Sequence, residues 1–184
     1  MWVMTTAPAA AAPDAPHARS PLGRGVLAVV RVGVALLWVQ NSGWKIPPDF
    51  GQGDPPQGLY AFARHAVDHE VFGPFAALME NLVLPNFALF GWLTLLLEAS
   101  IGAFLLVGLA TRFWALVGAG QSVVIALSVA NAPNEWVWSY LLMLLAHLAL
   151  FATAAGRYGG LDGVLRPLWQ RSGSPLARIL VRAS

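Results

Sequence analysis

Four long apolar stretches constrain this chain more than any other feature. They cover residues 26–44, 86–108, 113–131 and 136–155. Each has roughly the 20 predominantly apolar residues that a helix needs to cross a bilayer core. Leu and Ala are frequent in them, and the alternation of apolar and polar residues that marks a half-buried strand is missing. The sequence therefore predicts an all-α fold, a bundle of four transmembrane helices.

The composition agrees with a membrane protein and excludes a soluble enzyme. Of the 184 residues, 57% are hydrophobic and 11% are charged, whereas a soluble domain has about 25% charged residues. The pI near 9.5 rests on only 11 Lys and Arg against 9 Asp and Glu, so it does not indicate a nucleic-acid partner. The chain contains no Cys, which excludes disulfides, thiolate metal ligands and thiol redox chemistry within it.

The charged residues are divided unevenly between the two ends of the four stretches. The end that carries both termini holds eight basic residues: Arg19, Arg24, Arg112, Arg157, Arg166, Arg171, Arg178 and Arg182. The other end holds two basic and six acidic residues: Lys45, Arg64, Asp49, Asp54, Asp68, Glu70, Glu80 and Glu135. Because Lys and Arg favour the cytoplasmic side, we expect a multi-pass protein of a bacterial or archaeal-type cell membrane with both termini in the cytoplasm.

This pattern divides the chain into three regions. Residues 1–23 are rich in Ala and Pro, which is typical of a disordered tail, here cytoplasmic. Residues 24–168 form the four-span membrane domain. Residues 169–184 form a basic cytoplasmic tail, and we expect the membrane lipids of the inner leaflet to attract it. The simpler alternative is that its arginines only fix the topology.

The 45–85 loop has a helical pattern of its own. The pattern of residues 58–72 predicts a short helix. Pro74 is well placed to begin a second helix, which we expect to end at Pro85, before the next apolar stretch. We expect both helices to lie in the membrane interface across the outer mouth of the bundle. His65 and His69 share one face of the first helix and are weak candidate metal ligands, because zinc needs a third and a fourth ligand. A partly buried helix edge is the plainer explanation, and we expect no metal.

One polar side chain in each stretch lies at nearly the same distance from the cytoplasmic end. These residues are Arg31, Glu98, Gln121 and His147. At 1.5 Å per residue, all four lie roughly 10–15 Å from the inner boundary. An ionised side chain in the bilayer costs several kcal/mol unless it is paired, so we predict that Arg31 pairs with Glu98. Gln121 and His147 are expected to form hydrogen bonds alongside.

The polar layer has two interpretations. It can be a structural latch that fixes which helices pack together. It can also be a proton-handling or ligand-binding site in which Glu98 and His147 titrate. A second polar group, Gln40, Asn41 and Lys45, lies nearer the outer end and is a candidate lining of a pocket under the loop helices. Small residues such as Gly102 allow close helix packing, either within one chain or in a homo-oligomer.

Several short motifs occur in a fixed order along the chain. The second stretch contains Glu98, Gly102, Leu105 and Gly108, followed by Leu-Ala and then Thr111 and Arg112. The first stretch contains Arg-Val-Gly and ends in Gly-Trp-Lys, and the fourth is followed by Gly-Arg-Tyr-Gly-Gly-Leu-Asp. Over residues 24–168, this order resembles the DoxX/DoxD family of membrane proteins. The long outer loop and the segment after the fourth stretch resemble the DoxD branch.

The resemblance implies an integral membrane subunit of a quinone-linked oxidoreductase of the thiosulfate:quinone oxidoreductase type. It makes Glu98 and His147 the candidates for catalytic proton transfer. The candidate quinone-binding residues are Arg31, Gln121, Gln40, Asn41 and Lys45. It also implies a second oxidoreductase subunit or a soluble redox protein as partner, a membrane quinone as ligand, and no covalently bound cofactor. Two alternatives stay open: a non-catalytic anchor or assembly subunit for a soluble redox partner, and a small-solute carrier formed by an oligomer.

Two of the four residues singled out in the matching motifs also have plain structural explanations. Gly102 and Thr111 match the family pattern within and just after the second stretch. We expect Arg112 to satisfy backbone carbonyls at the end of that stretch and to anchor the short loop that follows. We expect Asp162 to cap a short interfacial helix over residues 163–169.

Overall fold

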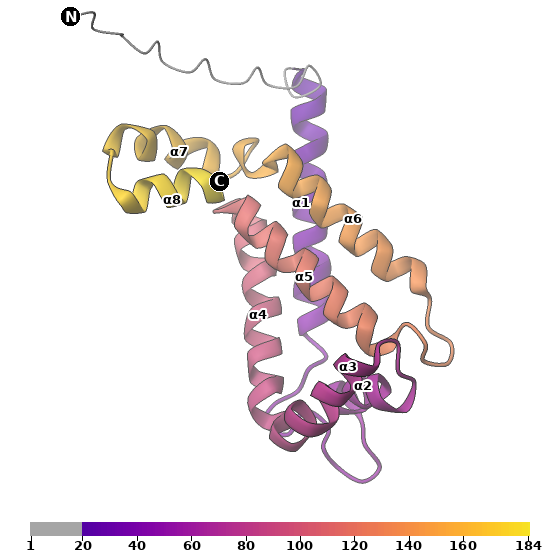
Figure 1. Cartoon of the computed structure of the whole chain (residues 1–184). Helices are drawn as coiled ribbons and strands as arrows, with labels where there is room; N and C mark the ends of the chain where they lie inside the picture. Colours follow the sequence, from indigo (N-terminus) through magenta and orange to yellow (C-terminus); the bar gives the residue numbers. More distant parts are fainter. Residues whose placement is uncertain (1–19) are drawn as a thin grey trace, which may run out of the picture.

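The computed structural model describes residues 20–184, and within them every regular element is a helix (Figure 1). The all-α fold is therefore confirmed. The predicted N-terminal tail lies outside the described residues as far as residue 19. The α-helices are α1 (Pro21–Ser42), α2 (Gly58–Asp68), α3 (Gly73–Leu78), α4 (Phe87–Val107), α5 (Thr111–Val129), α6 (Val137–Thr153), α7 (Leu161–Ser172) and α8 (Pro175–Ala183).

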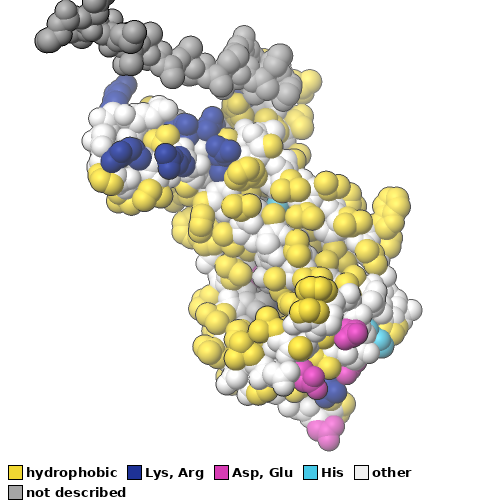
Figure 2. Space-filling view, in the orientation of Figure 1, with side chains coloured by type: hydrophobic (Ala, Val, Ile, Leu, Met, Phe, Trp, Pro, Cys, Tyr) yellow, Lys and Arg dark blue, Asp and Glu magenta, His cyan; other side chains and the backbone are white. Residues whose placement is uncertain are grey.

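All four predicted apolar stretches are helical. In the described part of the chain, three helical segments are long and apolar enough to cross a membrane: α1, the continuous run Gly73–Val107, and α5. The fourth, α6, is equally apolar but has 17 residues. Many large apolar side chains of these helices are exposed on the outside of the molecule (Figure 2), as expected of helices that face lipid.

The start of α1 differs from the prediction. It begins at Pro21, inside the predicted tail and ahead of the apolar stretch that starts at residue 26. The Ser20 hydroxyl accepts a hydrogen bond from the Gly23 N–H at 2.9 Å, and proline is favourable in the first turn of a helix. As a result, α1 extends beyond the end of α4, as Figure 1 shows.

The apolar helices pack in sequence along the chain, with α1 against α4, α4 against α5, and α5 against α6. They share one buried core: Ala35, Trp38, Ile101, Leu105, Ala115, Leu150 and Ala155. Gly102 lies at the closest approach of α1 and α4. A Cβ atom at Gly102 would lie 3.0 Å from Val39 Cγ2 and 3.3 Å from the Ala35 carbonyl oxygen. This contact fixes the register of α1 against α4.

The outer loop folds into a second, smaller core at the end of the molecule opposite to α7 and α8 (Figure 1). Its buried residues are Phe50, Ala63, Ala66, Met79 and Phe87. Both predicted loop helices are present as α2 and α3. The prediction that Pro85 ends the second loop helix is wrong, because the chain stays helical from α3 into α4. It passes through a π-helical turn (Met79–Val83) and a 3-10 turn (Leu84–Asn86), where Pro85 is tolerated.

Residues 169–184, which the sequence predicts as a tail, are folded. The helix predicted over 163–169 extends over Leu161–Ser172 as α7, and α8 packs back against it. Gly173 takes the left-handed conformation that ends α7, and the Ser174 hydroxyl caps α8 by accepting from the Ala177 N–H at 3.1 Å. The chain therefore ends in a helical hairpin.

Candidate functional site

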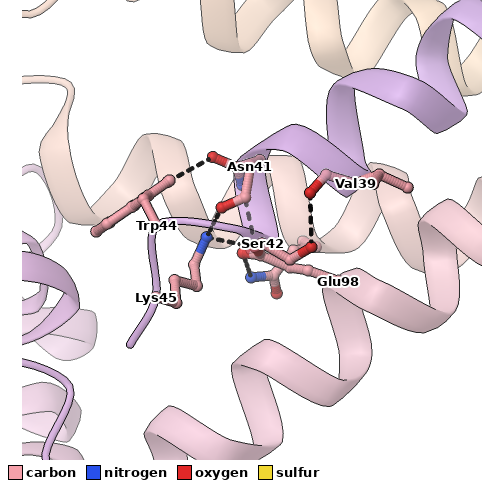
Figure 3. Close-up of polar contacts among 7 residues, drawn as sticks. Val39, Asn41, Ser42, Trp44, Lys45 and Glu98 are labelled. Carbon is pink, nitrogen blue, oxygen red and sulfur yellow. Dashed lines mark hydrogen bonds and ion pairs between the residues drawn. The ribbon is translucent and has the colours of Figure 1, made fainter. Parts of the chain in front are cut away.

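Glu98 of α4 lies at the centre of a buried polar cluster (Figure 3). Its side chain is 1% exposed, and the Lys45 ammonium lies 2.5 Å from Oε2. Asn41 Nδ2 donates to the same oxygen at 3.0 Å, and Gln121 Nε2 donates to Oε1 at 3.2 Å. Both carboxylate oxygens are therefore satisfied by three side chains that come from the end of α1, from the residues after it, and from α5.

The prediction that Arg31 pairs with Glu98 is wrong. The Arg31 guanidinium donates instead to three backbone carbonyls, those of Leu105 at 2.5 Å, Leu106 at 2.7 Å and Gly159 at 3.0 Å. Because α1 begins at Pro21 and extends past α4, Arg31 lies level with the last turn of α4, where carbonyls lack helical partners. The register set at Gly102 brings Asn41 and Lys45, further along the chain, to the depth of Glu98.

Lys45 is held in place by more than its charge. Its ammonium donates to the Asn41 carbonyl at 2.7 Å and lies 4.5 Å from the centroid of the Trp44 ring. Burial lowers the pKa of Lys45, and the Glu98 carboxylate opposes that effect. A buried pair with good geometry and satisfied hydrogen bonds is the arrangement in which two charges persist in an apolar setting.

An apolar cavity of about 460 Å³ adjoins this cluster. Its volume falls within the roughly 300–1,000 Å³ typical of small-molecule sites. The apolar part of its wall includes Phe62, Phe75, Met79, Phe87, Phe90 and Ile125. Its polar lining includes Asn41, Lys45, Thr94, Glu98, Gln121 and Tyr140. The charged pair is thus part of the wall of a pocket that the loop helices cover on one side.

His147 joins a different group from the one predicted. Its Nε2 accepts from the Trp38 indole N–H at 2.8 Å, and its Nδ1 lies 2.7 Å from the Met143 carbonyl oxygen. Since the indole can only donate, Nε2 carries no proton and Nδ1 donates to the carbonyl, which defines a neutral imidazole. The ring packs on Gly118, where a Cβ atom would come within 2.2 Å of His147 Cδ2. His147 therefore makes no bond to the Glu98 cluster in the described structure.

A second cavity of about 600 Å³ lies between α1 and α6 and includes His147 in its wall. Gln40, which is exposed and was expected to line the same pocket as Asn41 and Lys45, lines this one. Three residues line both cavities: Asn41, Trp44 and Met143. The two spaces therefore adjoin one another next to the polar cluster.

The two outer-loop histidines lie near each other without forming a metal centre. The His65 and His69 rings are 5.5 Å apart between centroids, on and just after α2. Among residues 20–184 there is no group of three or more His, Cys, Asp or Glu side chains placed to hold a metal ion. The residues around the pair thus supply no third ligand.

A family model described as "TQO small subunit DoxD" matches residues 27–181, which is most of the chain and runs from α1 to α8. The chain belongs to the DoxD family. The resemblance predicted from the sequence motifs is thereby confirmed. No curated protein and no solved structure matches the chain. As a DoxD protein with long apolar helices, the chain is a membrane protein.

Arg112 and Thr111, two residues on which the resemblance to the family rested, lie at the start of α5. Arg112 Nε donates to the Phe151 carbonyl at 3.2 Å, and its guanidinium lies 4.7 Å from the centroid of the Phe151 ring. The prediction that Arg112 satisfies carbonyls at the end of α4 is wrong, because Arg31 already does so. Thr111 is fully buried, and its hydroxyl oxygen has no hydrogen-bond partner among the described residues.

Asp162 caps a helix other than the one predicted. Its carboxylate accepts from the Ala110 N–H at 2.7 Å and from the Thr111 N–H at 2.9 Å, at the start of α5. Its own N–H donates to the Gly108 carbonyl at 2.8 Å. Gly160, not Asp162, is the N-cap of α7. In this DoxD protein Asp162 therefore joins the segment after α6 to the turn between α4 and α5.

Tyr140 is a cavity residue that the sequence patterns did not indicate. Its hydroxyl donates to Glu135, so its ring faces the 460 Å³ cavity while its polar end is already bonded. A tyrosine within an apolar stretch is an amphipathic side chain that needs a partner for its hydroxyl. That signal, together with Glu135 five residues earlier, would have placed it near the outer polar group.

Proposed function

We propose that this DoxD protein is the membrane subunit of a thiosulfate:quinone oxidoreductase and that the cavity beside Glu98 receives the quinone head group. The observation that carries the proposal is the buried Lys45–Glu98 pair in the wall of an apolar cavity of about 460 Å³. A quinone ring is flat and apolar and has two carbonyl oxygens that accept hydrogen bonds. The cavity offers apolar walls for the ring and donors at one side for an oxygen.

The cluster supplies the groups that quinone reduction needs. Reduction to a quinol adds two electrons and two protons, so a titratable group must lie within hydrogen-bond reach of a carbonyl oxygen. Lys45 and Gln121 are the donors that orient the ring, and Glu98 is the group that holds and passes a proton. The electrons come from thiosulfate through a partner subunit, since this chain has no Cys for thiol redox chemistry.

The second cavity provides the path for the quinone tail. It lies between α1 and α6, on the side of Asn41, Trp44 and Met143 away from the head-group cavity. Val34, Leu37 and Leu142 line it with apolar surface. A prenyl tail that leaves through this groove reaches the surrounding lipid directly.

The same proposal includes the membrane topology. Helices α1, α4, α5 and α6 each cross the bilayer, with the shorter α6 completed by the apolar residues beside it. Both termini lie in the cytoplasm, and α2 and α3 lie in the outer interface above the cavity. The uneven distribution of basic and acidic side chains between the two ends of the molecule supports this orientation (Figure 2).

A non-catalytic anchor for a soluble redox partner is the second candidate. The observation that favours it is that Glu98 is already satisfied by Lys45, Asn41 and Gln121. A latch of this kind holds α1, α4 and α5 together without any ligand.

Quinone binding by the purified protein in lipid nanodiscs separates the two candidates. We expect a short-chain ubiquinone analogue to quench the fluorescence of the wild-type protein, because Trp44 lines the cavity. Glu98→Gln should lower the affinity for the quinone analogue by about tenfold, which corresponds to about 1.4 kcal/mol. Alternatively, in the complex with the partner subunit, it should slow thiosulfate-driven reduction of the quinone by about tenfold. Glu80→Gln, on an exposed outer-loop position, is the matched control and should behave as wild type. Absence of quinone binding by the wild type would overturn the proposal in favour of the anchor.

A further inference from the structure

The hairpin of α7 and α8 is fixed in its orientation by buried contacts. Asp162, in the first turn of α7, is fully buried against the α4–α5 turn. Arg166 donates to the Ser184 hydroxyl at 2.8 Å, and Arg157 donates to the Ser184 carbonyl at 3.1 Å. Figure 1 shows the hairpin projecting sideways from the end of the molecule where α1 begins, across the direction of α4.

Large apolar side chains of the hairpin remain exposed even though its two helices pack together. Their exposed fractions are 42% for Leu161, 67% for Val164, 55% for Leu168, 65% for Leu176 and 63% for Ile179. The three in α7 are spaced i, i+3 and i+7, and the two in α8 are spaced i and i+3, so each helix presents one stripe. Figure 2 shows hydrophobic side chains along the edge of the hairpin that faces the apolar helices.

Basic side chains flank these stripes. Arg171, Arg178 and Arg182 are exposed, and none of them forms a hydrogen bond or an ion pair within residues 20–184. Arg171 follows Leu168 by three residues and Arg182 follows Ile179 by three, so a basic group adjoins each stripe. The only acidic residue of the hairpin, Asp162, is buried. The exposed charge of the hairpin is therefore wholly positive.

We propose that the α7–α8 hairpin is a binding surface for the head groups of anionic lipids. It lies flat on the cytoplasmic leaflet, with its five exposed apolar side chains in the boundary between head groups and acyl chains. Arg171 and Arg182, which adjoin the stripes, bind lipid phosphates. Because Asp162 joins the hairpin to the start of α5, the lipid surface holds the cytoplasmic ends of α4 and α5 at a fixed depth.

The absence of Cys from the chain allows a direct test on the full-length protein. The variant Leu176→Cys carries an environment-sensitive fluorophore on the exposed stripe of α8. Gln170→Cys is the matched control, because Gln170 is exposed and lies two residues past Leu168, on the other side of α7. Both proteins are placed in vesicles of phosphatidylcholine alone or with phosphatidylglycerol. We expect phosphatidylglycerol to shift the emission of the Leu176 label to the blue and to protect it from aqueous iodide, while the Gln170 label stays open to quenching.

The role of the arginines is tested in the same background. Replacing Arg171 and Arg182 together with Gln should raise the phosphatidylglycerol fraction that gives the half-maximal blue shift. A Leu176 label that iodide quenches as readily as the Gln170 label would overturn the proposal. So would protection that is equal in both lipid compositions, or protection that appears only when a soluble protein is added.

Discussion

Lys45, three residues past the end of α1, meets Glu98 of α4 at 2.5 Å, and the two side chains are 2% and 1% exposed. Among residues 20–184, no other oppositely charged side chain forms an ion pair with Lys45 or with Glu98. The pair therefore joins the C-terminal end of α1 to the middle of α4, and each residue depends on the other for neutralisation.

A double-mutant cycle measures that dependence. Lys45→Met leaves Glu98 buried without its counter-charge, and we expect it to lower the free energy of unfolding by about 3–5 kcal/mol. The double variant Lys45→Met/Glu98→Leu should lie much closer to wild type, because no uncompensated charge remains. Denaturant titration in micelles provides the measurement. Strictly additive losses from the two single variants would show that the groups do not interact.

Gly118 and Gly120 form a natural matched pair on α5. A Cβ atom at Gly118 would come within 2.3 Å of His147 Nε2, whereas nothing lies within 4 Å of one at Gly120. We expect Gly118→Ala to destabilise the protein by about 1–3 kcal/mol through overpacking. Gly120→Ala should instead stabilise it by about 0.5–1 kcal/mol, since alanine favours the helix. Equal melting temperatures for the two variants would contradict the packing of His147 on α5.

Asp162→Ala removes the cap at the start of α5. We expect a loss of about 1.5–3 kcal/mol in the free energy of unfolding, because two backbone N–H groups lose a charged acceptor. Hydrogen exchange locates the effect, and the amides of Ala110 and Thr111 should exchange faster. The exposed Asp54→Ala serves as the control. Unchanged protection at residues 110 and 111 would mean that another group caps α5.

The proposed tail path is tested by filling the groove between α1 and α6. Ala146→Trp places a large side chain in the second cavity, whereas Leu145→Trp lies on an exposed position outside both cavities. We expect Ala146→Trp to weaken binding of a long-tailed quinone by about tenfold, or about 1.4 kcal/mol, and to leave a tail-less analogue unaffected. Equal losses for both quinones would place the tail elsewhere.

Much of the fold was predictable because composition and helix length are local properties. The four apolar stretches correspond to α1, α4, α5 and α6, and the turn residues of the outer loop predicted α2 and α3. The depth of Arg31 was not predictable by counting from a helix end. The position of α1 along its axis depends on its contact with Gly102, which is a tertiary property.

The candidate site was predictable in its parts but not in its pairing. Glu98, Gln121, Asn41 and Lys45 were all singled out from the sequence, and the structure brings these four together. Counting residues from the helix ends paired Glu98 with Arg31, although α1 extends past the end of α4 and the helices do not end at one plane. Asp162 was assigned to its own helix for a similar reason, since its partners at residues 110 and 111 are remote in sequence.

The cap that Asp162 places on α5 has a consequence for biosynthesis. The turn between α4 and α5 emerges from the ribosome well before residue 162, and until then the first N–H groups of α5 lack this acceptor. The hydrogen bond from Arg31 to the Gly159 carbonyl likewise cannot form until Gly159 is synthesised, more than a hundred residues after Arg31. The cap on α5 and the third carbonyl contact of Arg31 therefore form only after α6 has been synthesised, so the last part of the chain to be made completes contacts between helices made earlier.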